Sequence, residues 1–167
     1  MEDKLSRKLT DLRISVTDRC NFRCRYCMPE ELYGEAYEFL SRDQVLSFEE
    51  IVRLTKIFIK LGINKIRLTG GEPLVRKNIE ELISSISRLD KNIDLAMTTN
   101  GYLLNKFSNI LFSSGLRRLT ISLDSLDNDI FQKMSGKKFS VEDILKGISS
   151  AKEAGFKNIK INSVIKK

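Results

Sequence analysis

Residues 12–27 of this 167-residue chain read LRISVTDRCNFRCRYC, a strand pattern that leads straight into a cluster of cysteines. Apolar and polar residues alternate at its start, with Leu12, Ile14 and Val16 on one side, which is typical of a short β-strand in a sheet. The cysteines follow without a helix or a linker between. The stretch therefore predicts a strand over 12–17 whose carboxyl end carries thiol groups.

The three cysteines of the chain are Cys20, Cys24 and Cys27, with the spacing C-x3-C-x2-C. An odd number in one short window is a poor disulfide framework, so it indicates metal or redox chemistry in a reducing compartment. Zinc prefers four ligands, and because the chain has no histidine, only Asp or Glu could complete a zinc site. A four-iron cluster fits better, since three thiolates hold three irons and leave the fourth open.

Strand and helix patterns alternate along the rest of the chain. Strands are expected over 12–17, 64–69, 93–98, 118–123 and 158–165, and helices over 47–62, 78–89, 103–114, 127–134 and 141–154, with 28–47 irregular. Short strands that alternate with helices are typical of right-handed crossovers and a parallel sheet. We therefore predict an α/β fold, an incomplete parallel (β/α) barrel with about five strands.

Unusual residues follow the expected strands, at the end where α/β folds place their chemistry. Gly70 and Gly71 let a backbone approach a ligand closely, and Glu72 could accept a hydrogen bond from an amine, although a plain turn uses the same residues. Ser122 and Asp124 point the same way from an apolar strand. They need partners, which either a ligand or neighbouring backbone could supply.

Three cations lie inside expected strands, where apolar residues are the norm: Arg13, Arg67 and Lys160. One hypothesis is that each points outward and extends its charged end to solvent between helices. We favour the other, in which the three line the inside of an open barrel and bind a polyanion such as a triphosphate.

Composition excludes several classes of function. Without histidine, Ser-His-Asp and Cys-His catalysis and histidine-ligated zinc hydrolysis are ruled out. The net charge of +7 is spread along the chain, and aromatic residues are not interleaved with basic ones, so no nucleic-acid partner is expected. No apolar run approaches the roughly 18 residues of a membrane helix, so we expect a cytoplasmic protein with no membrane partner.

Three blocks of sequence resemble the radical S-adenosylmethionine (SAM) superfamily and, within it, the GTP 3',8-cyclase family of molybdenum-cofactor biosynthesis. The blocks are residues 12–24, IRLTGGEPL at 66–74 and TTNG at 98–101. The resemblance implies that the cysteine trio binds a 4Fe–4S cluster whose open iron takes SAM. It further implies SAM contacts from Tyr26, Gly71, Glu72 and Ser122, and GTP contacts from Arg13, Arg67, Thr98 and Lys160.

The resemblance also implies the reaction, a lyase that converts GTP to a cyclic pyranopterin precursor intermediate. In that family the reduced cluster cleaves SAM to a 5'-deoxyadenosyl radical, which takes a hydrogen atom from the GTP ribose so that the ribose carbon attacks the guanine ring. An electron donor is then a necessary partner. Family members are longer and carry a second cysteine trio. Residues 1–167 are therefore expected to be a truncated radical SAM core domain without the second-cluster region, and its activity alone is left open.

Two other hypotheses remain. The chain could be a radical SAM enzyme for another substrate, or a non-enzymatic domain whose cysteines hold a structural metal ion. A brown protein after anaerobic purification favours a cluster over zinc, and loss of GTP binding on Arg67→Ala favours the cyclase. An unpaired edge strand at 158–165 also suggests a homodimer.

Overall fold

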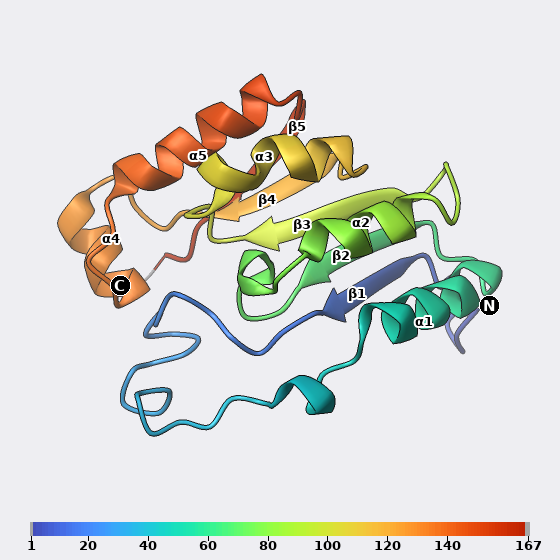
Figure 1. Ribbon diagram of the computed structural model, residues 1–167, viewed down its shortest axis with the longest axis horizontal. Helices are drawn as coiled ribbons and strands as arrows, with labels where there is room; N and C mark the ends of the chain where they lie inside the picture. Colours follow the sequence, from blue (N-terminus) through green and yellow to red (C-terminus); the bar gives the residue numbers. More distant parts are fainter. Residues whose placement is uncertain (1, 166–167) are drawn as a thin grey trace.

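Five parallel strands form one sheet in a computed structural model that describes residues 2–165. The elements are β1 (Asp11–Ser15), η1 (Arg42–Gln44), α1 (Phe48–Lys60), β2 (Lys65–Thr69), η2 (Pro73–Val75), α2 (Ile79–Ser87), β3 (Asp94–Thr99), α3 (Leu104–Ser113), β4 (Arg118–Ser122), α4 (Asn128–Ser135), α5 (Val141–Glu153) and β5 (Asn158–Asn162), where η marks a short 3-10 helix. The strand order is β1-β2-β3-β4-β5. Figure 1 shows the arrows of the strands pointing toward the side of the loop after β1 and of α4. The predicted incomplete α/β barrel is confirmed.

One face of the sheet is apolar and covered by helices. In β2, Ile66 and Leu68 are buried, and they belong to the same hydrophobic core as Leu82 and Ile83 of α2. Figure 1 shows α1, α2, α3 and α5 along this face. Burial of this apolar face is the main stabilising contribution to the fold, because the alternation of each strand places its apolar side chains under the helices.

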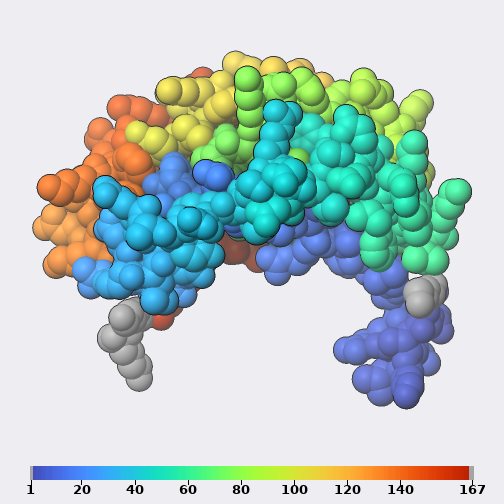
Figure 2. Space-filling model, turned by 60° about the horizontal axis from the view of Figure 1, so that its bottom comes forward, coloured from blue at the N-terminus to red at the C-terminus, as the bar shows by residue number. Residues whose placement is uncertain are grey.

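The opposite face of the sheet is polar, and within residues 2–165 no helix covers it. The register pairs Arg13 with Arg67, Thr98 with Thr120, and Thr120 with Lys160, so these side chains project from the same face. Figure 2 shows the molecule hollowed below the helices. The three strand cations therefore lie on the open face, as the barrel hypothesis predicts.

Most element boundaries agree with the sequence prediction, but two details were wrong. The last strand ends at Asn162 instead of 165, because the next two residues do not continue the backbone pairing with β4. Ser163 Oγ donates to the Leu123 carbonyl, and Val164 N–H donates to Asp124 Oδ1, so each bond involves a side chain. The irregular stretch 28–47 contains the unpredicted η1. Among the described residues, no helix is long and apolar enough to cross a membrane.

Candidate functional site

A cavity of about 360 Å³ lies where β1 and β2 end, and all three cysteines line it. Its volume is within the range of roughly 300–1,000 Å³ that small-molecule sites occupy. The lining also includes the backbone of Gly70 and Gly71 and aromatic side chains from the segment that follows the cysteines. The sequence prediction that the thiols and the Gly-Gly turn share one site is consistent with this arrangement.

The cysteine loop is shaped by its own backbone and by α4. The N–H groups of Cys27 and Met28 both donate to the Cys24 carbonyl, at 2.9 and 2.8 Å, which closes a tight turn between the last two thiols. The N–H of Arg23 donates at 2.8 Å to the Ser135 carbonyl at the end of α4. These hydrogen bonds are made within the chain, and they fix the path of the loop that carries the three thiols.

Solvent exposure differs among the three thiols. Burial raises the pKa of Cys20 and raises that of Cys24 to about 12, whereas Cys27 is exposed. Bare Cys20 and Cys24 are therefore neutral thiols near pH 7, and metal binding there releases protons. Within residues 2–165, no three His, Cys, Asp or Glu side chains are grouped to hold a single metal ion.

Two observations fit a larger ligand in the cavity. The three thiols face one shared space, as a cluster with one cysteine per iron requires. Asp18 also lines this space, and its Oδ1 atom is buried without a hydrogen-bond partner among the described residues. A buried carboxylate oxygen needs a donor, and a bound ligand can provide it. Asp18 was not predicted as a site residue, although it stands two positions before Cys20.

The Gly-Gly turn packs against the segment that precedes Cys20. Gly71 N–H donates to the Thr17 carbonyl at 2.6 Å, and Glu72 N–H donates to the Arg19 carbonyl at 2.8 Å. A Cβ added at Gly71 would lie 2.2 Å from the Arg19 carbonyl oxygen. The glycine therefore permits a close approach of backbone to backbone, in addition to lining the cavity. A direct contact of Gly71 with SAM stays a prediction.

Glu72 is not among the residues that line the cavity, and its side chain joins two loops. Its side chain is 1% exposed and accepts hydrogen bonds from the Thr99 hydroxyl (2.7 Å), the Asn100 N–H (2.7 Å) and the Leu74 N–H (3.1 Å). Burial raises its pKa to about 6, although these hydrogen bonds lower it. In this structure Glu72 holds the loops after β2 and β3 together. A direct contact of Glu72 with SAM stays a prediction.

The raised pKa of Glu72 predicts a pH-dependent contribution to stability. A carboxyl whose pKa rises from 4.5 to about 6 on folding stabilises the fold most below pH 4.5 and loses that contribution as the pH rises through 6. Relative to Glu72→Gln, we expect the free energy of unfolding of the wild type to fall by roughly 2 kcal/mol over this range. Urea unfolding at several pH values measures it. A pH-independent difference would show that the folded carboxyl has an ordinary pKa.

Tyr26 and Ser122, the other residues predicted to contact SAM, lie outside the cavity lining. The Tyr26 hydroxyl donates at 2.7 Å to Asp124 Oδ2, and burial together with this bond raises the pKa of Tyr26. Asp124 is thus satisfied within the chain, the alternative that the sequence left open. Ser122 is half-buried on the polar face at the end of β4, where it pairs in register with Asn162. SAM contacts from both residues stay predictions.

The four residues predicted to contact GTP lie on one face of the sheet, on β1, β2, β3 and β5. Arg67 Nη1 donates to Thr120 Oγ1 at 2.8 Å and to Thr98 Oγ1 at 3.3 Å. Arg67 and Lys160 line one cavity of about 200 Å³ on the open face, and Arg13 is the register partner of Arg67. Among the described residues, none of these three cations forms an ion pair. Their charge is therefore available to an anion.

Two residues that organise the site were not predicted from the sequence. Thr120 accepts the shorter hydrogen bond of Arg67, and its place two residues before Ser122, on the same strand face, was the available signal. Asn100 donates to Asn21 Oδ1 at 2.8 Å, and its Nδ2 lies 4.0 Å from Cys20 Sγ, so it joins the loop after β3 to the cysteine loop. Its position in the Thr-Thr-Asn-Gly block gave no indication of this partner.

A parallel sheet with three thiols at the end of its first strand defines a radical SAM core. The chain matches the profile of the Radical SAM superfamily over residues 14–167 and belongs to that family. Among curated proteins, it is 49% identical over 167 residues to a GTP 3',8-cyclase of Staphylococcus haemolyticus and 45% identical over 167 residues to one of Staphylococcus aureus. Each match takes in 100% of this chain and 49% of the relative. The chain spans about half the length of these curated relatives.

Solved structures show the same fold. Streptococcus suis SuiB bound to S-adenosylmethionine matches with a TM-score of 0.74 and 23% identity, over 96% of this chain and 33% of that one. Methylornithine synthase (PylB) matches with a TM-score of 0.72 and 16% identity, over 94% of this chain and 45% of that one. Family membership gives a 4Fe–4S cluster and SAM as the cofactors and favours an enzyme over a structural metal domain.

Proposed function

We propose that residues 1–167 are the radical SAM core of a GTP 3',8-cyclase, with a cofactor site at the cysteine cavity and a triphosphate site on the open face. The observation that carries the substrate assignment is the group formed by Arg13, Arg67 and Lys160, none of which has an acidic partner in the described chain. The similarity to curated GTP 3',8-cyclases over the full chain supports it.

At the cofactor site, the chain's own groups bind and orient. Cys20, Cys24 and Cys27 would hold the cluster, with one iron left open for SAM. When bound, the cluster would supply the one-electron reduction of SAM from which radical chemistry on the substrate starts. The Gly-Gly turn leaves the cavity wall without side chains there, and Glu72 joins that turn to the loop after β3 by hydrogen bonds.

At the substrate site, the arginine and lysine groups would bind the triphosphate. Arg67 is positioned by two threonine hydroxyls, so its remaining donors can face a phosphate. Gly70 follows Arg67 by three positions of extended chain, a distance of about 10 Å. A nucleotide anchored by its phosphates at Arg67 and Lys160 could therefore extend its ribose toward the cysteine cavity.

Removal of the Arg67 guanidinium tests the assignment. We expect Arg67→Ala to raise the dissociation constant for GTP about 10-fold to 100-fold, because a charge-assisted pair is lost. Isothermal titration calorimetry on the anaerobically reconstituted chain measures this with GTP and with inorganic tripolyphosphate. Arg53→Ala, an exposed cation on α1, is the matched control and should bind like the wild type.

A second candidate function is a radical SAM reaction on another substrate. Unchanged GTP affinity in Arg67→Ala, together with SAM cleavage that GTP does not stimulate, would favour it over the cyclase. Formation of 5'-deoxyadenosine under strong reductant, with and without GTP, separates the two.

The same proposal includes a partner and a location. We propose a one-electron donor as partner, because the cluster must be reduced for SAM cleavage. We also propose a cytoplasmic location, which is supported by three cysteines that form no disulfide in this structure, and we propose no membrane or nucleic-acid partner. A homodimer through the exposed edge of β5 stays a proposal, supported by the unpaired strand.

A further inference from the structure

The segment that follows the cysteines, residues 28–40, forms one wall of the cofactor cavity. Tyr33, Tyr37 and Phe39 line the cavity and contact each other, with ring centroids 4.6 Å apart for the first pair and 4.8 Å apart for the second. We name residues 28–40 the aromatic wall. It contains neither a regular helix nor a strand, so no ladder of backbone hydrogen bonds holds it in place.

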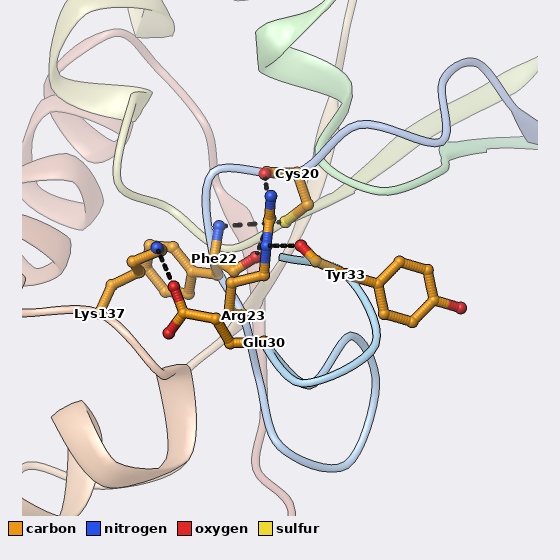
Figure 3. Close-up of polar contacts among 6 residues, drawn as sticks. All are labelled: Cys20, Phe22, Arg23, Glu30, Tyr33 and Lys137. Carbon is orange, nitrogen blue, oxygen red and sulfur yellow. Dashed lines mark hydrogen bonds and ion pairs between the residues drawn. The ribbon is translucent and has the colours of Figure 1, made fainter. Parts of the chain in front are cut away.

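Arg23 joins the aromatic wall to the cysteine loop. Its Nη1 donates to the carbonyls of Cys20 and Phe22, both at 2.8 Å, and its Nε donates to the Tyr33 carbonyl at 2.8 Å. Figure 3 shows the guanidinium between these carbonyl groups. The same guanidinium lies 5.5 Å from the centroid of the Phe39 ring. One half-buried side chain thus contacts the middle of the wall at Tyr33, its far end at Phe39, and the backbone of Cys20.

Other residues fasten the far end of the wall. The Leu40 N–H donates to Asp18 Oδ2 at 2.7 Å, and Arg19 Nη2 donates to the Leu40 carbonyl at 3.2 Å. Near the start of the wall, Glu30 and Lys137 form an exposed ion pair at 3.5 Å, which contributes little. The attachments at Tyr33 and Leu40 therefore carry most of the wall's ordering.

We propose that the aromatic wall shields the cluster bound by the three cysteines from water and dissolved solutes, and that Arg23 is the positioning residue that keeps the wall closed. The inference rests on the proposed cluster site. A loop with few backbone hydrogen bonds opens easily unless side chains hold it. Arginine can satisfy three carbonyls at once because its donors form a planar fork, whereas lysine keeps the charge but not this geometry.

The test measures how fast an external iron chelator removes iron from the anaerobically reconstituted chain. We expect Arg23→Lys to bind the wild-type amount of iron and to lose it to the chelator about tenfold faster, because the open wall becomes more populated. Phe39→Ala should show a similar acceleration. The double variant should lose iron at about the rate of the faster single variant, because both substitutions open the same wall. Arg25→Lys, an exposed neighbour in the same loop, is the matched control.

A second variant keeps the proposal testable if Arg23→Lys does not fold. Leu40→Pro removes the backbone N–H that donates to Asp18 Oδ2 and should also accelerate iron loss. Wild-type rates of iron loss in Phe39→Ala and Leu40→Pro would overturn the shielding role. A wild-type rate in a folded Arg23→Lys would overturn the role of Arg23. A wild-type chain that binds no iron would instead contradict the proposed function itself.

Discussion

Alanine at Cys24 is expected to abolish binding of the 4Fe–4S cluster and, with it, cleavage of SAM. Each cysteine would hold a different iron, so the loss of one thiolate cannot be compensated by the other two. The substitution leaves the backbone carbonyl of Cys24 in place, so the turn that its hydrogen bonds to Cys27 and Met28 form is retained. The expected defect is therefore one of iron binding and not of folding.

Iron per chain after anaerobic reconstitution and the yield of 5'-deoxyadenosine measure the effect. Both should fall to background in Cys24→Ala, and equally in Cys20→Ala and Cys27→Ala. Met28→Ala is the matched control, since Met28 lines the same cavity but has no thiol, and should keep its iron. Full cluster absorbance in Cys27→Ala would contradict the three-thiolate site.

Residues on strands could be placed from sequence because alternation decides the face. Once the strand that contains Arg67 is recognised, the Arg67 side chain must project from the face opposite to the buried Ile66 and Leu68. That opposite face is the open face of the sheet. The same reasoning places Arg13 beside Arg67 through the parallel register and Lys160 on the same face of the sheet. The placement of the three cations on one face was therefore predictable in outline before any contact was known.

Residues in loops could not be placed, because their partners are distant in the chain. Glu72 bonds to Thr99, which is 27 positions later, and Tyr26 bonds to Asp124, which is 98 positions later. No periodic pattern links such pairs. The segment 28–40 has no periodicity either, so neither its contacts with Arg23 nor its place beside the thiols could be read from the sequence.

Alanine at Gly71 is expected to destabilise the chain by about 2–4 kcal/mol and to lower cluster binding sharply. The added Cβ would lie 2.2 Å from the Arg19 carbonyl oxygen and 2.8 Å from that of Asp18, and both obstacles are backbone atoms that cannot rotate away. The two segments must separate, which breaks the 2.8 Å hydrogen bond from Glu72 N–H to Arg19. Because residues 18 and 19 lead into Cys20, the first thiol moves with them.

Gly62→Ala separates this effect from that of backbone strain. Gly62 has a φ of +107°, but the nearest atom to an added Cβ is 3.8 Å away, so alanine there meets strain without a collision. Gly71 has the opposite combination, a collision without a positive φ. We expect Gly62→Ala to cost about 1–3 kcal/mol and to keep its iron, whereas Gly71→Ala loses iron as well as stability. Urea unfolding and iron content measure both variants. Equal iron content in the two would mean that the packing of the Gly-Gly turn against residues 17–19 does not position the cysteine loop.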